Sequence, residues 1–184
     1  MATILRKLKL CFTTLCVVFS YTSTAQPPSP GEHLYWPNMD NFIGTWKWVN
    51  GTDEVTIKLK KIHLFNARGN FYTDDIMGSH CYIQNGITIE NTLAEFPNIG
   101  QFSRSSIDLW YWGDDNTPNT LTGQLRDPLH RKNERLYLTY IPGTVPTIKW
   151  NVEPIPGAWT DKPGQLPRIP GYTMPEEIIL IKQP

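Results

Sequence analysis

Apolar and polar residues alternate along most of the chain after residue 41. Leu136, Leu138 and Tyr140 alternate with polar neighbours, and the same period of two recurs over residues 146–153. This period is typical of a β-strand with one buried face, and no apolar stripe of helical period runs longer than two turns. We therefore expect an all-β chain with strands at 44–49, 53–59, 71–84, 87–90, 104–112, 119–126, 134–141, 146–153 and 177–183.

Two Asn-Gly pairs lie between such runs and predict tight turns. Asn50-Gly51 separates residues 44–49 from residues 53–59, and Asn85-Gly86 separates residues 80–84 from residues 87–90. A two-residue type I′ turn needs a positive φ at both positions, which Asn and Gly tolerate best. Each pair therefore predicts a two-residue hairpin.

The first of these turns also predicts a register between its two strands. A loop made of residues 50 and 51 places Lys47 opposite Glu54 on one face and Trp46 opposite Val55 on the other. The first pair is ionic and the second is apolar, so the register is self-consistent. The residues expected on the inward face are Trp46, Trp48, Val55, Ile57 and Leu59.

The links between the predicted strands are mostly short, which favours an antiparallel meander of eight to nine strands. Such a meander either closes into a barrel or folds into a β-sandwich, and we favour the barrel. A long loop rich in proline and glycine at 154–175 interrupts the pattern. Loops of this length are usually functional, so it is either a fixed lid or a strut across the mouth of the barrel.

The N-terminal region reads as a targeting segment. Arg6, Lys7 and Lys9 precede an apolar run over residues 10–21, and small residues follow at 23–25. This order is typical of a cleavable secretory signal peptide, and the apolar run is shorter than a membrane span. We expect a signal peptide at 1–25, a proline-rich leader at 26–41 and one domain at 42–184, in a protein that is periplasmic or secreted.

The charge balance and the cysteine content further restrict the class of protein. The 17 basic and 17 acidic residues balance, so no basic surface for nucleic acid is indicated. Cleavage after residue 25 removes two of the three cysteines and leaves Cys81 alone, which excludes an intramolecular disulfide. The mature domain must therefore be stabilised by its core.

The start of the first predicted strand resembles a known pattern. Gly44 and Trp46 form the Gly-x-Trp opening found in lipocalin and calycin barrels. The longer run over residues 40–61 and the closing run over residues 173–183 resemble an uncharacterised family of exported Bacteroidota proteins, a domain of unknown function. The resemblance covers residues 40–183 and implies a compartment and a compact domain but no reaction. The disulfide and C-terminal helix of typical lipocalins are not expected here.

No sequence motif for catalysis is present: the chain has no GxSxG, HExxH, Walker or GxGxxG pattern. His33, His63, His80 and His130 show no metal-ligand spacing. The acidic pairs at 74–75 and 114–115 adjoin turn residues, so we interpret them as turn caps. We expect no catalytic residue, no metal site and no cofactor, although a hydrolase with dispersed residues remains an alternative.

Ligand binding is better supported than catalysis, because tryptophan is abundant in the chain. Our first hypothesis is a pocket inside the barrel for a small apolar or amphipathic ligand, lined by Trp48, Ile57, Leu109 and Trp150. The alternative is an exposed aromatic platform that stacks on the sugar rings of a glycan, formed by Trp110, Trp112 and Trp159. We predict no membrane span after cleavage and make no prediction of the oligomeric state.

Overall fold

The computed structural model describes residues 28–100, 105–110, 119–155, 164 and 166–184. The predicted signal peptide (1–25) lies outside these residues. The strands are β1 (His33–Leu34), β2 (Gly44–Asn50), β3 (Asp53–Asn66), β4 (Phe71–Gln84), β5 (Ile87–Asn91), β6 (Ile107–Trp110), β7 (Thr120–Asp127), β8 (Lys132–Ile141), β9 (Thr147–Glu153) and β10 (Glu177–Lys182). Two short 3₁₀ helices, η1 (Pro37–Phe42) and η2 (Leu93–Asn98), complete the described elements.

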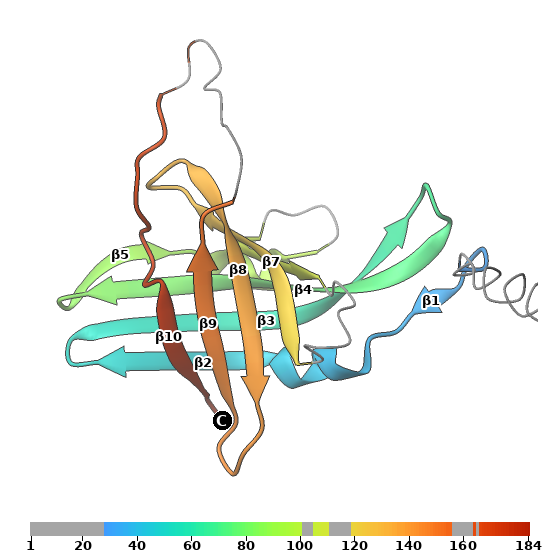
Figure 1. The fold of residues 1–184 in the computed structure, drawn as a ribbon, viewed down its shortest axis with the longest axis horizontal. Helices are drawn as coiled ribbons and strands as arrows, with labels where there is room; N and C mark the ends of the chain where they lie inside the picture. Colours follow the sequence, from blue (N-terminus) through green and yellow to red (C-terminus); the bar gives the residue numbers. More distant parts are fainter. Residues whose placement is uncertain (1–27, 101–104, 111–118, 156–163, 165) are drawn as a thin grey trace, which may run out of the picture.

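Eight of the strands close into an antiparallel barrel (Figure 1). Their order around the barrel is β4, β3, β2, β10, β9, β8, β7 and β6, and β6 pairs again with β4. The all-β prediction and its lipocalin-like barrel are confirmed, in place of the alternative β-sandwich. Within the described part of the chain, no helix is long and apolar enough to cross a membrane.

Strands β3 and β4 are longer than the rest of the barrel requires. Each has 14 residues, and their shared turn extends beyond the other strands (Figure 1). Strand β1 pairs in parallel with the first residues of β4 in this extension. The strand predicted at 71–84 includes the β4 half of this extension. The β3 half was not predicted, because the alternation in residues 53–59 gives no signal that the strand continues to Asn66.

The core lies inside the barrel and follows the predicted alternation. Trp46, Ile57 and Leu59 are buried, and Trp48 packs against their cluster. The indole of Trp46 donates a hydrogen bond from Nε1 to the Phe42 carbonyl at 2.8 Å, so η1 is tied to the first barrel strand. Burying such side chains supplies about 1.5–3 kcal/mol each. Within the described residues Cys81 is free, so the core stabilises this part of the fold without a disulfide.

Two glycines allow neighbouring strands of the barrel wall to approach closely. A Cβ on Gly123 would overlap the carbonyl oxygen of Asp108 and lie 2.7 Å from Cα of Leu109. A Cβ on Gly78 would overlap the carbonyl oxygen of Lys58 and lie 2.6 Å from a methyl group of Leu59. The backbones of neighbouring strands approach so closely at these two points that only glycine fits.

The second Asn-Gly prediction is confirmed and the first is wrong in its register. Asn85 and Gly86 both have positive φ and form the loop between Gln84 and Ile87. In the first hairpin Asn50 pairs with Asp53, so the loop is Gly51-Thr52 and only Gly51 has a positive φ. A turn that begins with a positive φ at glycine and continues with a negative φ is of type II′.

The turn lies one residue later than predicted, so each predicted partner moves by two positions along the opposite strand and the inward face is unchanged. Trp46 lies opposite Ile57 instead of Val55, and Lys47 lies opposite Thr56 instead of Glu54. Lys47 still reaches Glu54 diagonally, with Nζ 2.8 Å from Oε2. The pair lowers the pKa of Glu54, chiefly through the hydrogen bond from Lys47.

Candidate functional site

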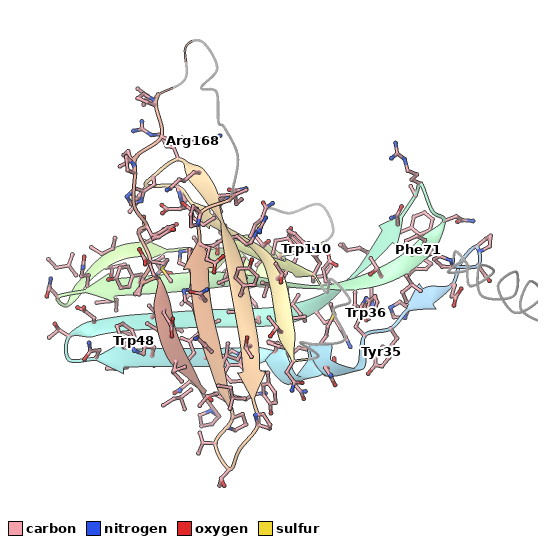
Figure 2. All side chains as sticks on the ribbon, in the orientation of Figure 1. Tyr35, Trp36, Trp48, Phe71, Trp110 and Arg168 are labelled. Atoms are coloured by element: carbon pink, nitrogen blue, oxygen red, sulfur yellow. The ribbon has the colours of Figure 1, made fainter. Side chains whose placement is uncertain are left out.

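The residues predicted to line an internal pocket all belong to or pack against one buried apolar cluster. Ile57, Leu109 and Trp150 are fully buried in a single apolar cluster, and Trp48 packs against it while partly exposed (Figure 2). Trp150 also donates from Nε1 to the Pro175 carbonyl at 3.0 Å. The hollows described below are lined by other residues, so a cavity between these four side chains stays a prediction.

Of the predicted glycan platform, the structure describes one member. Trp110 is partly exposed on the outer face of β6 and borders a hollow of about 310 Å³ with Thr122, Gln124 and Arg135 (Figure 2). Trp112 and Trp159 lie outside the described residues. A platform requires at least two rings in one plane, so this alternative also stays a prediction.

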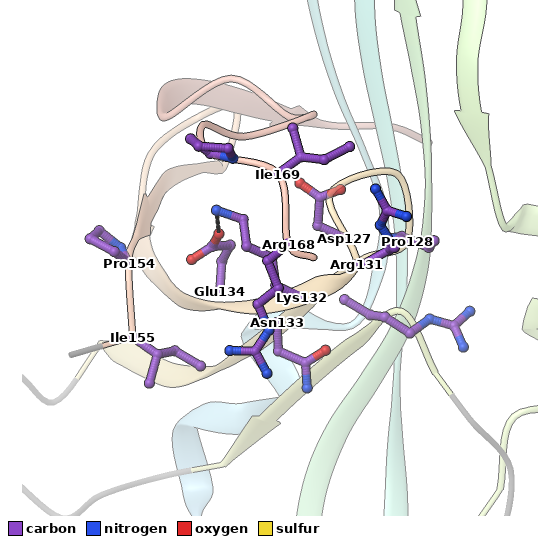
Figure 3. A pocket seen from close by; sticks show the side chains of 12 residues that line it. Asp127, Pro128, Arg131, Lys132, Asn133, Glu134, Pro154, Ile155, Arg168 and Ile169 are labelled. Carbon is purple, nitrogen blue, oxygen red and sulfur yellow. Dashed lines mark ion pairs between the residues drawn. The ribbon is translucent and has the colours of Figure 1, made fainter. Parts of the chain in front are cut away.

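A larger hollow, the β7–β8 pocket, lies where the turn between β7 and β8 meets the proline-rich loop (Figure 3). Its volume is about 750 Å³, within the range of cavities that hold small molecules. Three segments line it: the end of β7 with its turn, the start of β8, and the two ends of the proline-rich loop. The lining residues are Arg126, Asp127, Pro128, Arg131, Lys132, Asn133, Glu134, Pro154, Ile155, Arg168, Ile169 and Pro170.

Asp127 holds the loop against the turn. Its carboxylate accepts hydrogen bonds from the Thr173 hydroxyl (2.6 Å), the Thr173 amide (2.9 Å) and the His130 amide (3.0 Å). The Ile169 amide adds a bond to the His130 carbonyl at 3.1 Å. Burial raises the pKa of Asp127, but the hydrogen bonds from Thr173 and His130 lower it by more, so its net pKa lies below the ordinary 3.8. This network fixes one wall of the pocket.

The pocket carries a surplus of positive charge. Four cationic side chains line it against two carboxylates, and both carboxylates are engaged. Lys132 pairs with Glu134 at 2.5 Å (Figure 3), and Asp127 is occupied by its hydrogen bonds. Within the described part of the chain, the side chain of Arg131 makes no ion pair, and Nε of Arg126 is buried without a hydrogen-bond partner.

A second polar cluster lies inside the wall, where β4 changes partner from β6 to β5. Nδ1 of His80 lies 2.9 Å from Oγ of Ser106, and Nε2 lies 3.4 Å from a carboxylate oxygen of Glu90. The order serine, histidine, carboxylate is the one a hydrolase uses. However, Ser106 is 1% exposed and its hydroxyl also contacts Thr92 (2.9 Å), so the serine is buried and already engaged in hydrogen bonds.

The acidic pair at 74–75 lies within strand β4, so its interpretation as a turn cap is wrong. The two side chains point to opposite faces of the strand, as neighbours on a strand must. Burial, together with repulsion from Asp108 and Asp74, raises the pKa of Asp75 to about 6. Asp74 faces the opposite way, toward two histidines.

The third cluster, the His33–His63–Asp74 cluster, lies on the extension of β3 and β4. Nε2 of His33 and Nδ1 of His63 lie 2.8 Å and 2.5 Å from the same oxygen of Asp74, Oδ1. The three potential ligand atoms all lie within 4.8 Å of one another. Sequence reasoning missed the cluster because no short spacing joins these residues. The cluster forms only when β1 pairs with β4. Because β1 has only two residues, its sequence shows no strand pattern that would predict this pairing.

Comparison with known proteins assigns the chain to a family. The model of a family of unknown function, DUF6705, matches residues 6–183, nearly the whole chain. No curated protein and no solved structure matches the chain. The match agrees with the coarser part of the resemblance drawn from residues 40–61 and 173–183, a family without an assigned reaction. The function must therefore be argued from the geometry of the chain itself.

Proposed function

The chain belongs to this family of unknown function, and we propose that it is a non-catalytic binding protein for a small amphipathic anion. The ligand occupies the β7–β8 pocket, at the surface of the barrel, instead of the barrel interior. The observation that carries this proposal is the surplus of cationic side chains around a hollow of about 750 Å³ with an apolar wall.

The cationic side supports an acidic head group. Arg131 has no ion pair within the described residues, and the guanidinium fork pairs well with carboxylate, sulfate or phosphate oxygens. Lys132 and Arg126 add positive charge at the same rim, although each also contacts a carboxylate. A neutral ligand gains nothing from this field, whereas an anion is attracted to it.

The apolar side supports a hydrocarbon tail. Ile155 and Ile169 come from the two ends of the proline-rich loop, and Pro128, Pro154 and Pro170 lie beside them. Proline and the bonds to Asp127 fix this wall in advance, so little conformational entropy is lost when a ligand binds. A mixed lining of this kind is common in small-molecule pockets.

The absence of catalysis is part of the proposal. The serine, histidine and carboxylate of the hydrolase-like cluster are each less than 10% exposed in the barrel wall, which does not favour catalysis there. We further propose that residues 1–25 direct export and are removed, so that binding takes place in the periplasm or outside the cell. The predicted signal peptide supports this location.

The test uses decanoate as the amphipathic anion and 1-decanol as its uncharged counterpart. Isothermal titration of the mature protein is expected to detect decanoate at one molecule per chain and to detect little or no decanol. Arg131→Glu reverses a charge inside the pocket and is expected to weaken decanoate binding by about tenfold or more, since each 1.4 kcal/mol is a factor of ten.

The matched control is Arg68→Glu, which makes the same charge change on the exposed turn between β3 and β4. It is expected to leave decanoate binding unchanged. Equal binding of decanol and decanoate, or equal losses in the two variants, would contradict the proposed pocket.

A further inference from the structure

The His33–His63–Asp74 cluster is assembled by strand register. His63 lies directly opposite Asp74 in the antiparallel pair of β3 and β4, so both side chains project from the same face. His33 lies opposite Tyr72 in the parallel pair of β1 and β4, and Tyr72 is two residues from Asp74. Because side chains repeat every second residue along a strand, all three share one face.

Hydrogen bonding alone leaves the carboxylate of Asp74 incompletely satisfied. Both imidazoles point to Oδ1, while Oδ2 is buried and has no hydrogen-bond partner within the described residues. The side chain is 0% exposed, so water does not compensate for the missing partner. A buried charge with an unpartnered oxygen is costly, which makes a cation at this point favourable.

Among the residues that the structure describes, no side-chain ammonium fills that role. The ammonium of Lys61 lies near enough to feel the charge of Asp74, but it is paired with Asp40 at 2.5 Å. The described residues therefore provide two imidazoles and one buried carboxylate that keeps an unpartnered oxygen. This is a donor set for a metal ion.

We propose that Nε2 of His33, Nδ1 of His63 and Asp74 bind one Zn²⁺ ion. Two imidazole nitrogens and one carboxylate oxygen are ligands that Zn²⁺ prefers, and three protein ligands leave a fourth position for water. Tetrahedral ligands about 2.0–2.1 Å from Zn²⁺ are about 3.3 Å apart. The two histidine nitrogens must therefore move outward from Oδ1 by less than one ångström.

The surroundings permit this movement and the entry of the ion. The side chains of His33 and His63 are 40% and 64% exposed, so both rings can rotate while Asp74 stays fixed in the strand. The site lies on different elements from the β7–β8 pocket and does not depend on the proposed function.

The test is a calorimetric titration of the mature protein with ZnCl₂. The protein is prepared without a polyhistidine tag and freed of metal by chelation, and the pH is held where imidazole is neutral. We expect one Zn²⁺ per chain and a rise in the melting temperature on binding. His33→Gln and His63→Gln are each expected to weaken binding by about a hundredfold.

A matched control and a spectroscopic readout complete the test. His130→Gln removes a histidine that bonds Asp127 and Thr173 elsewhere, and it is expected to leave Zn²⁺ binding unchanged. In ¹⁵N spectra of the imidazoles, Zn²⁺ is expected to shift Nε2 of His33 and Nδ1 of His63. The two glutamine variants change exposed side chains, and the melting temperature of each metal-free variant verifies its fold.

Three results would overturn the site. They are the absence of Zn²⁺ binding by the wild-type protein, binding that persists in folded His33→Gln and His63→Gln, and binding that is lost in His130→Gln.

Discussion

At two positions in the barrel wall, the absence of a side chain determines how closely neighbouring strands approach. At Gly123 the side chain is a hydrogen atom because the backbone of β6 occupies the space that a Cβ would need. The same holds at Gly78 against β3. Neither glycine needs a positive φ, so each is required by close approach and not by its conformational freedom.

Replacement of Gly123 by alanine is expected to lower the free energy of unfolding by about 3 kcal/mol. The added methyl group overlaps the Asp108 carbonyl oxygen, and backbone atoms cannot rotate away as a side chain can. Urea denaturation followed by tryptophan fluorescence measures the change. The control is Gly143→Ala, whose Cβ meets its nearest atom at 3.5 Å and is expected to change stability by less than about 0.5 kcal/mol. Equal effects would show that β6 and β7 do not approach closely at Gly123.

At the scale of elements, one carboxylate joins the β7–β8 turn to the proline-rich loop. Asp127 contacts the turn through His130 and the loop through Thr173. The loop requires such an anchor in either case, whether it is a strut without a role in binding or a lid over the pocket. The anchor also explains how the described end of the loop near Thr173 keeps one wall of the pocket in place.

The lowered pKa of Asp127 makes this anchor dependent on pH. A carboxyl group whose pKa is depressed on folding contributes stability above its ordinary pKa and loses it as the pH falls through the folded value. Asp127→Asn is therefore expected to lower the melting temperature at neutral pH. The difference from wild type is expected to shrink below pH 3.8, where the wild-type group takes up its proton. A difference that stays constant across this range would contradict the charged anchor.

A comparison of strands, turns and strand pairings shows which features the local sequence predicts and which it does not. The alternation through Trp46 and Ile57 predicted the inward face, because a period of two is a property of each strand alone. The turn after Asn50 was placed one residue early, since Asn-Gly and Gly-Thr both permit a tight turn and the choice depends on the paired strands. The cluster around Asp74 was not predicted, because it needs β1 to dock beside β4.

At the scale of the whole molecule, β10 is the strand that completes the wall between β2 and β9. It pairs with both neighbours and buries Ile178 and Leu180 in the core. Truncating one such side chain costs about 2–5 kcal/mol, and a domain of this size has only about 5–15 kcal/mol of stability in total. Loss of β10 is therefore expected to remove most of the stability of the barrel.

A chain ending at Glu176 is expected to lose cooperative thermal unfolding, measured by circular dichroism. The truncation removes two buried side chains and exposes the hydrogen-bonding edges of β2 and β9. A chain ending at Gln183 keeps the bond from the Gln183 amide to the Thr45 carbonyl and serves as the control. A sharp transition in the shorter chain would mean that the barrel tolerates an open wall.

The pairing of β2 with β10 also governs how fast the protein folds. It joins Trp46 to Lys182, so the barrel closes through a contact between positions near opposite ends of the described chain. Chains dominated by such distant contacts fold in milliseconds to seconds, because the entropy of closing a long loop is lost before the contact forms. Closure must wait until the last strand is available, and until then the apolar side chains that meet in the finished core remain accessible to other chains.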